Sequence, residues 1–165
     1  MFKLYTVFAL TMMLPLFASA KPTFANLAGV YQIKSCENAG TSSQDNICQF
    51  DTMVVKPSEY STAIYFYKSD DGAGPYRSLG FPTTEDLTPG ESYKEQDTTS
   101  ASYLTLSRDY REATSLYQNA DGTFHLSMYR SSIVFKTNDL FEMTLVKVSN
   151  STPEIPTIPG GGDAD

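Results

Sequence analysis

The chain has 165 residues, with 12 Lys and Arg against 19 Asp and Glu and a net charge of −7 at pH 7. This acidic balance argues against electrostatic binding to nucleic acid or to an anionic membrane surface. A hydrophobic fraction of 41% argues against a chain that is disordered as a whole. One His and two Cys leave little material for a metal site, so we expect no metal and no cofactor.

Residues 1–20 have the pattern of a secretory signal peptide. Lys3 supplies a positive start, residues 4–17 are mostly apolar, and Ala18-Ser19-Ala20 resembles a cleavage site. The apolar stretch is shorter than the ~20 residues with which a helix crosses a bilayer, which argues against an N-terminal membrane anchor. We therefore expect a secreted protein, periplasmic or extracellular, with no integral membrane anchor after cleavage.

The expected folded domain is 21–149, because the composition changes at residue 150. Residues 150–165 contain three prolines, Gly160-Gly161-Gly162 and a final pair of acids. Such a segment can bury little apolar surface to offset the entropy of ordering it. We expect a flexible tail.

Cys36 and Cys48 are the two cysteines of the chain. An oxidising compartment favours a disulfide between them, which would close a polar loop. A free thiol and a redox pair are the alternatives, and the eleven intervening residues are not the spacing of a CxxC redox motif. We expect a structural disulfide.

Between residues 26 and 149 the apolar residues recur mainly with a period of two, which predicts β-strands. Turn residues separate these segments at 119–122 and 137–139, and 81–90 has the composition of a connecting loop. Residues 109–118 also fit a helical face, and we expect their second half to be a strand. The expected strands are 27–34, 50–56, 60–67, 100–107, 123–129, 131–136 and 139–145.

These segments predict an all-β fold of roughly eight antiparallel strands. A sheet of this size must protect its edges, either by closing into an up-and-down barrel or by folding over as a β-sandwich. Connections between sequence neighbours favour the barrel.

The segment Phe24-Ala25-Asn26-Leu27-Ala28-Gly29-Val30-Tyr31 resembles the opening of lipocalin-like (calycin) β-barrels. The resemblance implies that Gly29 allows a tight bend and that Tyr31 plugs one end of the barrel, where that family usually has Trp. It also implies a late basic residue over the plug, for which Arg130 is the candidate. The loop stapled by Cys36 and Cys48 would then lie near the open mouth.

In a barrel, one face of every strand points inward. The inward-facing residues would line a site for a small apolar or amphipathic ligand, or fill the interior. These candidate ligand-binding residues are Phe124, Leu126, Met128, Phe141 and Met143. A hollow interior indicates a non-enzymatic ligand-binding domain, and a filled one indicates a protein–protein or envelope interaction module that uses a Tyr-rich outer face or the disulfide loop.

No catalytic residue is expected. His125 is the single imidazole, and it lies in a predicted strand without a recognisable catalytic spacing to Ser, Cys or Asp. Residues 70–74 (Asp-Asp-Gly-Ala-Gly) are acidic enough to suggest Ca²⁺, but they lack the spaced acids and the closing Glu of an EF-hand loop. We interpret them as a solvated turn.

Overall fold

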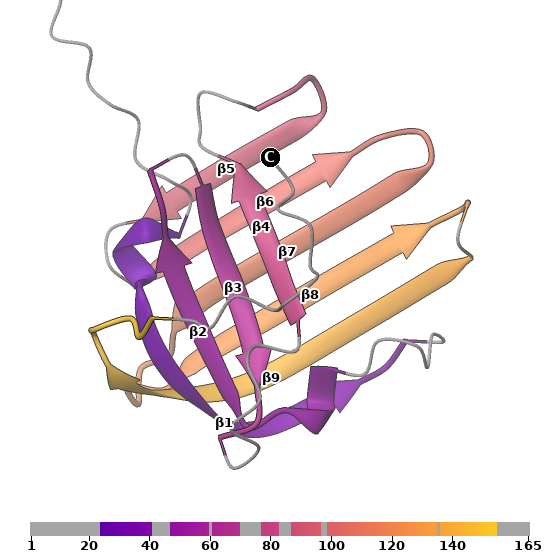
Figure 1. Ribbon diagram of the computed structural model, residues 1–165. Helices are drawn as coiled ribbons and strands as arrows, with labels where there is room; N and C mark the ends of the chain where they lie inside the picture. The colour runs from indigo at the N-terminus through magenta and orange to yellow at the C-terminus, as the bar shows by residue number, and fades with distance from the viewer. Residues whose placement is uncertain are drawn as a thin grey trace, which may run out of the picture.

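The described residues fold as one curled antiparallel sheet of nine strands (Figure 1). The structure is a computed structural model, and it describes residues 24–40, 47–59, 61–69, 77–82, 87–96, 99–134 and 136–154. The strand order is β4-β3-β2-β1-β9-β8-β7-β6-β5. The all-β prediction is confirmed, with nine strands in place of roughly eight.

Every strand pairs with its neighbour in sequence except at β4 and β5, and β1 also pairs with β9. Two 3-10 turns accompany the sheet, η1 (Ala25–Leu27) and η2 (Ile47–Gln49). The strands are β1 (Gly29–Asn38), β2 (Thr52–Pro57), β3 (Ser61–Tyr67), β4 (Arg77–Pro82), β5 (Glu91–Gln96), β6 (Ser100–Leu106), β7 (Tyr110–Gln118), β8 (Phe124–Ser132) and β9 (Thr137–Ser149).

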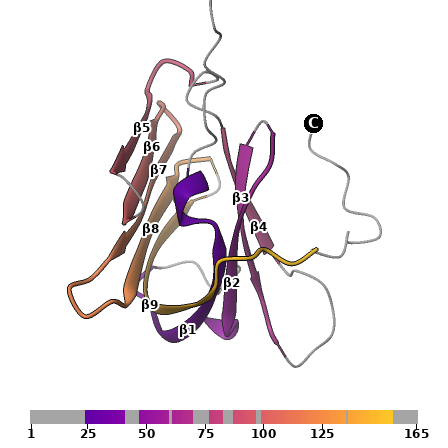
Figure 2. The ribbon, with the colours of Figure 1, turned by 90° about the vertical axis from the view of Figure 1, so that its left-hand side faces the viewer.

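The sheet bends along β1 and β9, so that its two halves face each other as a half-barrel (Figure 2). β4 and β5 form the two ends of the strand order. Aromatic side chains bridge this opening: the Phe24 ring lies 4.7 Å from Phe81 of β4 and 6.1 Å from Tyr93 of β5, centroid to centroid. Phe81 also contacts Tyr103 of β6 edge to face at 5.5 Å. β4 and β5 are not hydrogen-bonded to each other, so the two halves are joined there by side-chain packing.

Period-two alternation decides which residues enter the core. In β8, Phe124, Leu126 and Met128 are buried, while the residues between them are partly exposed. β3 alternates in the same way, with Ile64 and Phe66 buried. Because neighbouring inward residues pair across the sheet, these side chains form one continuous hydrophobic cluster inside the curl.

The strand expected in the second half of 109–118 is confirmed, and β7 includes the first half as well, since pairing with β6 and β8 outweighs the helical spacing. Two other expectations about local structure are wrong. The last hairpin has turn residues at 133, 134 and 136, so 137–139 begins β9 instead of forming the turn, and the strand expected at 131–136 ends at Ser132. The expected loop 81–90 overlaps the end of β4, and β5, which has few apolar residues, was missed.

The expected signal peptide (1–20), the turn expected at 70–74 and residues 155–165 lie outside the described residues. The start of the expected tail is described: the Pro153 carbonyl accepts a hydrogen bond from Lys56 Nζ at 3.4 Å. Pro153 therefore lies beside β2. Among the described residues, no helix is long and apolar enough to cross a membrane.

Candidate functional site

The five predicted ligand-binding residues lie together on the concave face of β8 and β9. Leu126 pairs with Met143 and Met128 pairs with Phe141 across the two strands, and Phe124 pairs with Leu145. All five belong to the hydrophobic cluster, and Leu126 and Met143 have no surface accessible to water. The sequence therefore predicted their position correctly, and whether they bind a ligand stays a prediction.

The concave face changes from apolar to polar along the strands. The deepest shared row is Ala101, Leu116, Leu126 and Met143. The next row is Tyr93, Tyr103, Thr114, Met128 and Phe141. The row after that is Glu91, Thr105, Glu112, Arg130 and Asp139.

In the polar row, Glu112 and Arg130 are linked through the hydroxyl of Tyr110, which lies outside the row. The Tyr110 hydroxyl donates a short hydrogen bond to Glu112 Oε2, and Arg130 Nε donates to the Tyr110 hydroxyl oxygen at 3.2 Å. Burial, and then the bond to Glu112, raise the pKa of Tyr110. Asp139 is buried, and its Oδ1 has no hydrogen-bond partner.

Glu91 and Tyr103 form a second polar contact in this part of the sheet. The Tyr103 hydroxyl donates to Glu91 Oε1 at 2.5 Å, and burial followed by this bond raises the pKa of Tyr103. The Thr88 backbone N–H donates to Glu91 Oε2 at 2.7 Å and is the main cause of a lowered pKa at Glu91. This arrangement orders the start of β5.

Gly29, Tyr31 and Lys147 form the opposite end of the curl, called the plug end below. Tyr31 is fully buried, its hydroxyl donates to the Leu27 carbonyl at 2.5 Å, and burial raises its pKa. Lys147 Nζ lies 5.5 Å from the Tyr31 ring centroid, and partial burial lowers its pKa. The candidate Arg130 is wrong for this place, because the register of β1 with β9 sets Tyr31 opposite Lys147, whereas Arg130 lies in the polar row.

The Cys36–Cys48 disulfide is formed, with the Cα atoms 5.2 Å apart. It joins β1 to η2, and Cys36 lies opposite Met143 in the ladder with β9. β1 runs away from the plug end, so the disulfide loop follows at the other end of the half-barrel. Its residues 41–46 lie outside the described part.

His125 has polar neighbours on the outer face that the sequence spacing did not reveal. His125 Nε2 lies 2.5 Å from Glu142 Oε2, and Ser127 Oγ donates to Glu142 Oε1 at 2.8 Å. The ladder between β8 and β9 brings these distant residues together. Ser127 and His125 both use the Glu142 carboxylate, whereas a nucleophilic serine is activated by a hydrogen bond to the histidine itself.

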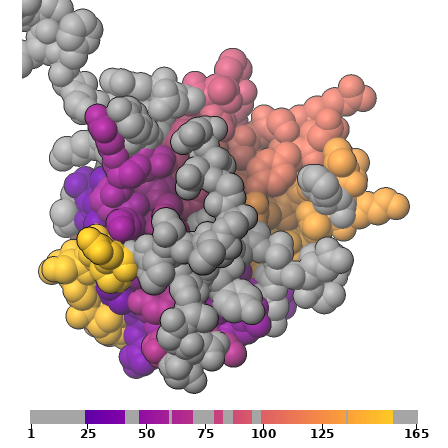
Figure 3. All heavy atoms as spheres, in the orientation of Figure 1, coloured from indigo at the N-terminus to yellow at the C-terminus, as the bar shows by residue number. Residues whose placement is uncertain are grey.

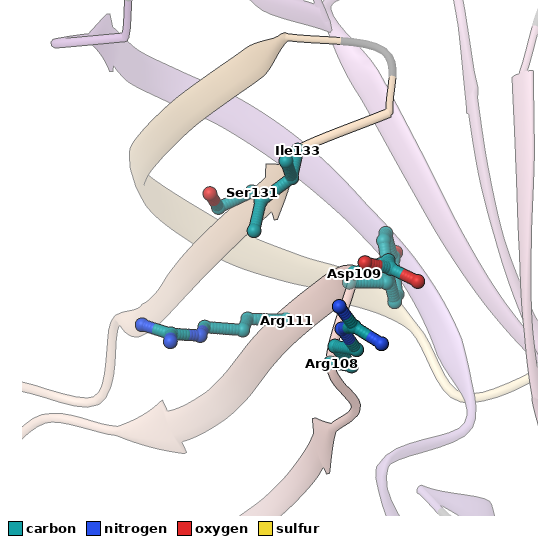
Figure 4. Close-up of a pocket in the computed structure, with 6 residues that line it drawn as sticks. Arg108, Asp109, Arg111, Ser131 and Ile133 are labelled. Atoms are coloured by element: carbon teal, nitrogen blue, oxygen red, sulfur yellow. The ribbon is translucent and has the colours of Figure 1, made fainter.

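A surface pocket lies between the β6–β7 connection and the end of β8 (Figure 4). It has a volume of about 150 Å³, and the Ile133 N–H donates to the Asp109 carbonyl at 3.0 Å across it. Arg108 reaches it from the turn before β7, and Arg111 reaches it from β7 itself. No ion pair or hydrogen bond joins either guanidinium to another described side chain. The lining residues are Arg108, Asp109, Tyr110, Arg111, Ser131 and Ile133.

Exposed apolar side chains flank this pocket. Leu106 is 52% exposed, Ile133 68% and Val134 66%. Leu106 pairs with Arg111 across β6 and β7, and Arg111 pairs with Ser131 of β8, so the apolar and basic side chains are contiguous. We call Leu106, Arg108, Arg111, Ile133 and Val134 the tip surface. The β6–β7 and β8–β9 hairpin ends lie at the right-hand side of Figure 1, and this part of the molecule projects in Figure 3.

The tip surface was not predicted from the sequence. The apolar run 133–135 lies in a segment expected to be a strand, whereas Ile133 and Val134 lie in an exposed turn. Among the described residues, no group of three or more His, Cys, Asp or Glu could hold a metal ion. No protein-family model matches the chain, and no curated protein matches it.

Proposed function

We propose that this protein is an exported, non-enzymatic interaction domain that docks a partner protein through the tip surface. The observation that carries the proposal is the contiguous exposure of Leu106, Ile133 and Val134 beside two arginines. Arginine is enriched in protein interfaces, and contiguous exposed apolar side chains mark interaction sites. Single exposed apolar residues need no explanation, but three at adjacent hairpin ends do.

The packing of the concave face supports a docking domain over a carrier. Leu116, Leu126, Met143 and Leu145 have no water-accessible surface, so each is covered by its neighbours. The rings of Phe24 and Phe81 fill further space between the two halves. A long apolar ligand would have to displace these side chains, and that reduces the net gain from burying it.

Export is part of the proposal. The signal-like residues 1–20 and a formed disulfide both favour an oxidising compartment. Mass spectrometry of the protein from the producing organism checks this part: we expect a mature chain that begins at Lys21 and has two fewer hydrogens than the reduced form. An intact leader or two free thiols would contradict it.

The docking function is tested by the size of the protein in a native extract. We expect the parent to elute in a complex larger than the monomer, and a double variant Ile133→Ser/Val134→Ser to elute as the monomer. Val148 is 58% exposed on another part of the sheet, so Val148→Ser is the matched control and should elute like the parent. Equal elution of the tip variant and the parent would overturn the proposal.

The graded polarity of the concave face favours a second candidate function, binding of a small amphipathic ligand. The apolar part would contact Met128 and Phe141, and the head group would lie near Glu112, Arg130 or Asp139. Methyl NMR tests this candidate, because Met53, Met128 and Met143 are all buried in the cluster. Saturable shifts of the Met128 and Met143 methyl signals on addition of dodecanol would support it, and unchanged signals would exclude it.

A further inference from the structure

The tip surface has a chemically complementary segment within the same chain. Residues 155–165 read Ile-Pro-Thr-Ile-Pro-Gly-Gly-Gly-Asp-Ala-Asp, which is an apolar pair followed by two acids. The tip surface places Ile133 and Val134 beside Arg108 and Arg111. We propose that the tip surface binds residues 155–165 of a second copy of the chain, so that the protein associates head to tail.

This inference rests on the proposed docking function and names its partner. Prolines favour the polyproline II conformation, in which residues three apart lie on the same face. Ile155 and Ile158 are three apart, and each precedes a proline, so they would contact the exposed apolar residues together. The glycines that follow let Asp163 and Asp165 reach the guanidinium groups, where carboxylates form paired hydrogen bonds with arginine.

Geometry directs the segment to another copy. Pro153 is held beside Lys56, which adjoins the plug end because Val55 pairs with Gly29. Ile158 lies five residues further on, at most about 18 Å even when fully extended. β9 has 13 residues and connects the plug end to the tip surface, and the length along a strand of that size is about 40 Å. This is more than twice the reach of the segment, so the tip surface of a second copy is the favoured site for Ile155 and Ile158.

Charge also favours a short acidic segment over an extended anionic surface. The whole protein carries −7, so a planar anionic membrane would be repelled by most of the chain. Arg108 and Arg111 act over about the 10 Å Debye length, which suits local carboxylates. Because donor and acceptor surfaces differ, the contact is heterologous and leads to open chains of molecules.

Complementation between two variants of the purified protein tests the inference. One variant ends at Glu154 and keeps the tip surface, and the other, Arg108→Gln/Arg111→Gln, keeps the segment. Sedimentation velocity at low salt should show concentration-dependent association of the parent and at least tenfold weaker association of each variant alone. A mixture of the two should form a 1:1 complex, because it restores one tip surface and one segment.

Lys34→Gln/Lys68→Gln is the matched control, because it removes two exposed cations elsewhere and should associate like the parent. A synthetic peptide of residues 150–165 should bind the shortened variant, and a scrambled peptide should not. Far-UV circular dichroism confirms that each variant is folded.

Three results would overturn the inference: a monomeric parent with no peptide binding, association that survives in both variants, or tip-dependent flotation of the parent with phosphatidylserine vesicles. If the parent is monomeric but the Ile133→Ser/Val134→Ser variant still leaves the native complex, the docking function stands and a different protein is the partner. If neither complex exists, both proposals fail.

Discussion

The close approach of β1 to β9 at the plug end requires that Gly29 has no side chain. Its φ is +147°, and a Cβ added there would overlap the Ser149 carbonyl oxygen and lie 2.6 Å from Lys147 Cε. Gly29→Ala therefore adds two costs, backbone strain of about 1–2 kcal/mol and overpacking of about 1–3 kcal/mol. We expect a loss of roughly 3 kcal/mol in the free energy of unfolding.

Two other glycines separate these contributions. Gly122 has φ +85° with no atom within 4 Å of an added Cβ, so Gly122→Ala should lose only the backbone part, about 1–2 kcal/mol. Gly80 has open space and no positive φ, so Gly80→Ala should be neutral or more stable by up to about 1 kcal/mol.

Urea denaturation followed by far-UV circular dichroism is the assay, since the chain has no Trp. With a slope of about 1–3 kcal/mol per M, Gly29→Ala should lower the midpoint by roughly 1–3 M. A loss for Gly29→Ala no larger than that for Gly122→Ala would refute the close approach of β1 to β9 at the plug end.

Three further predictions concern the core, the disulfide and pH. Leu126→Ala should lose about 2–5 kcal/mol, because Leu126 is fully buried between Leu116 and Met143, and a small loss in urea denaturation would indicate a loosely packed interior. Replacing Cys36 and Cys48 by Ser should lose roughly 3 kcal/mol, and a reductant should then no longer affect stability. Burial raises the pKa of Tyr31 above its ordinary value near 10, so the folded state keeps a proton that the unfolded chain releases. Stability should therefore be complete below pH 10 and fall as the pH rises above it, and Tyr31→Phe should make that fall shallower in urea midpoints measured from pH 8 to 11.

Alternation was sufficient to predict the all-β fold, because inward and outward residues of an antiparallel sheet obey a period of two. It placed Phe124, Leu126 and Met128 on the inner face of β8 correctly. β5 escaped prediction because Glu91–Gln96 has a single apolar residue, Tyr93, and is held at the edge by its ladder with β6. The register between strands cannot be predicted from a single sequence. For this reason Lys147 was not recognised as the residue over Tyr31.

In the candidate site, too, features set by the local sequence could be predicted and features set by strand register could not. The disulfide could be predicted from the sequence, since the chain has two cysteines and they can pair in one way only. The tip surface depends on two hairpin ends meeting, through Ile133 and Asp109, and on a turn that exposes apolar residues. An apolar run near a turn predicts burial by default, so exposure could be recognised only from the fold.

Site-specific photo-cross-linking is the most direct test of the docking surface. A photoreactive amino acid placed at Val134 and, in a separate protein, at Val148 compares two valines of similar exposure, 66% and 58%. In the producing organism, the protein labelled at Val134 should form one predominant adduct that disappears when Ile133 is changed to Ser, and the protein labelled at Val148 should not form it. Equal adducts from both positions, or none from Val134, would contradict docking through the tip surface.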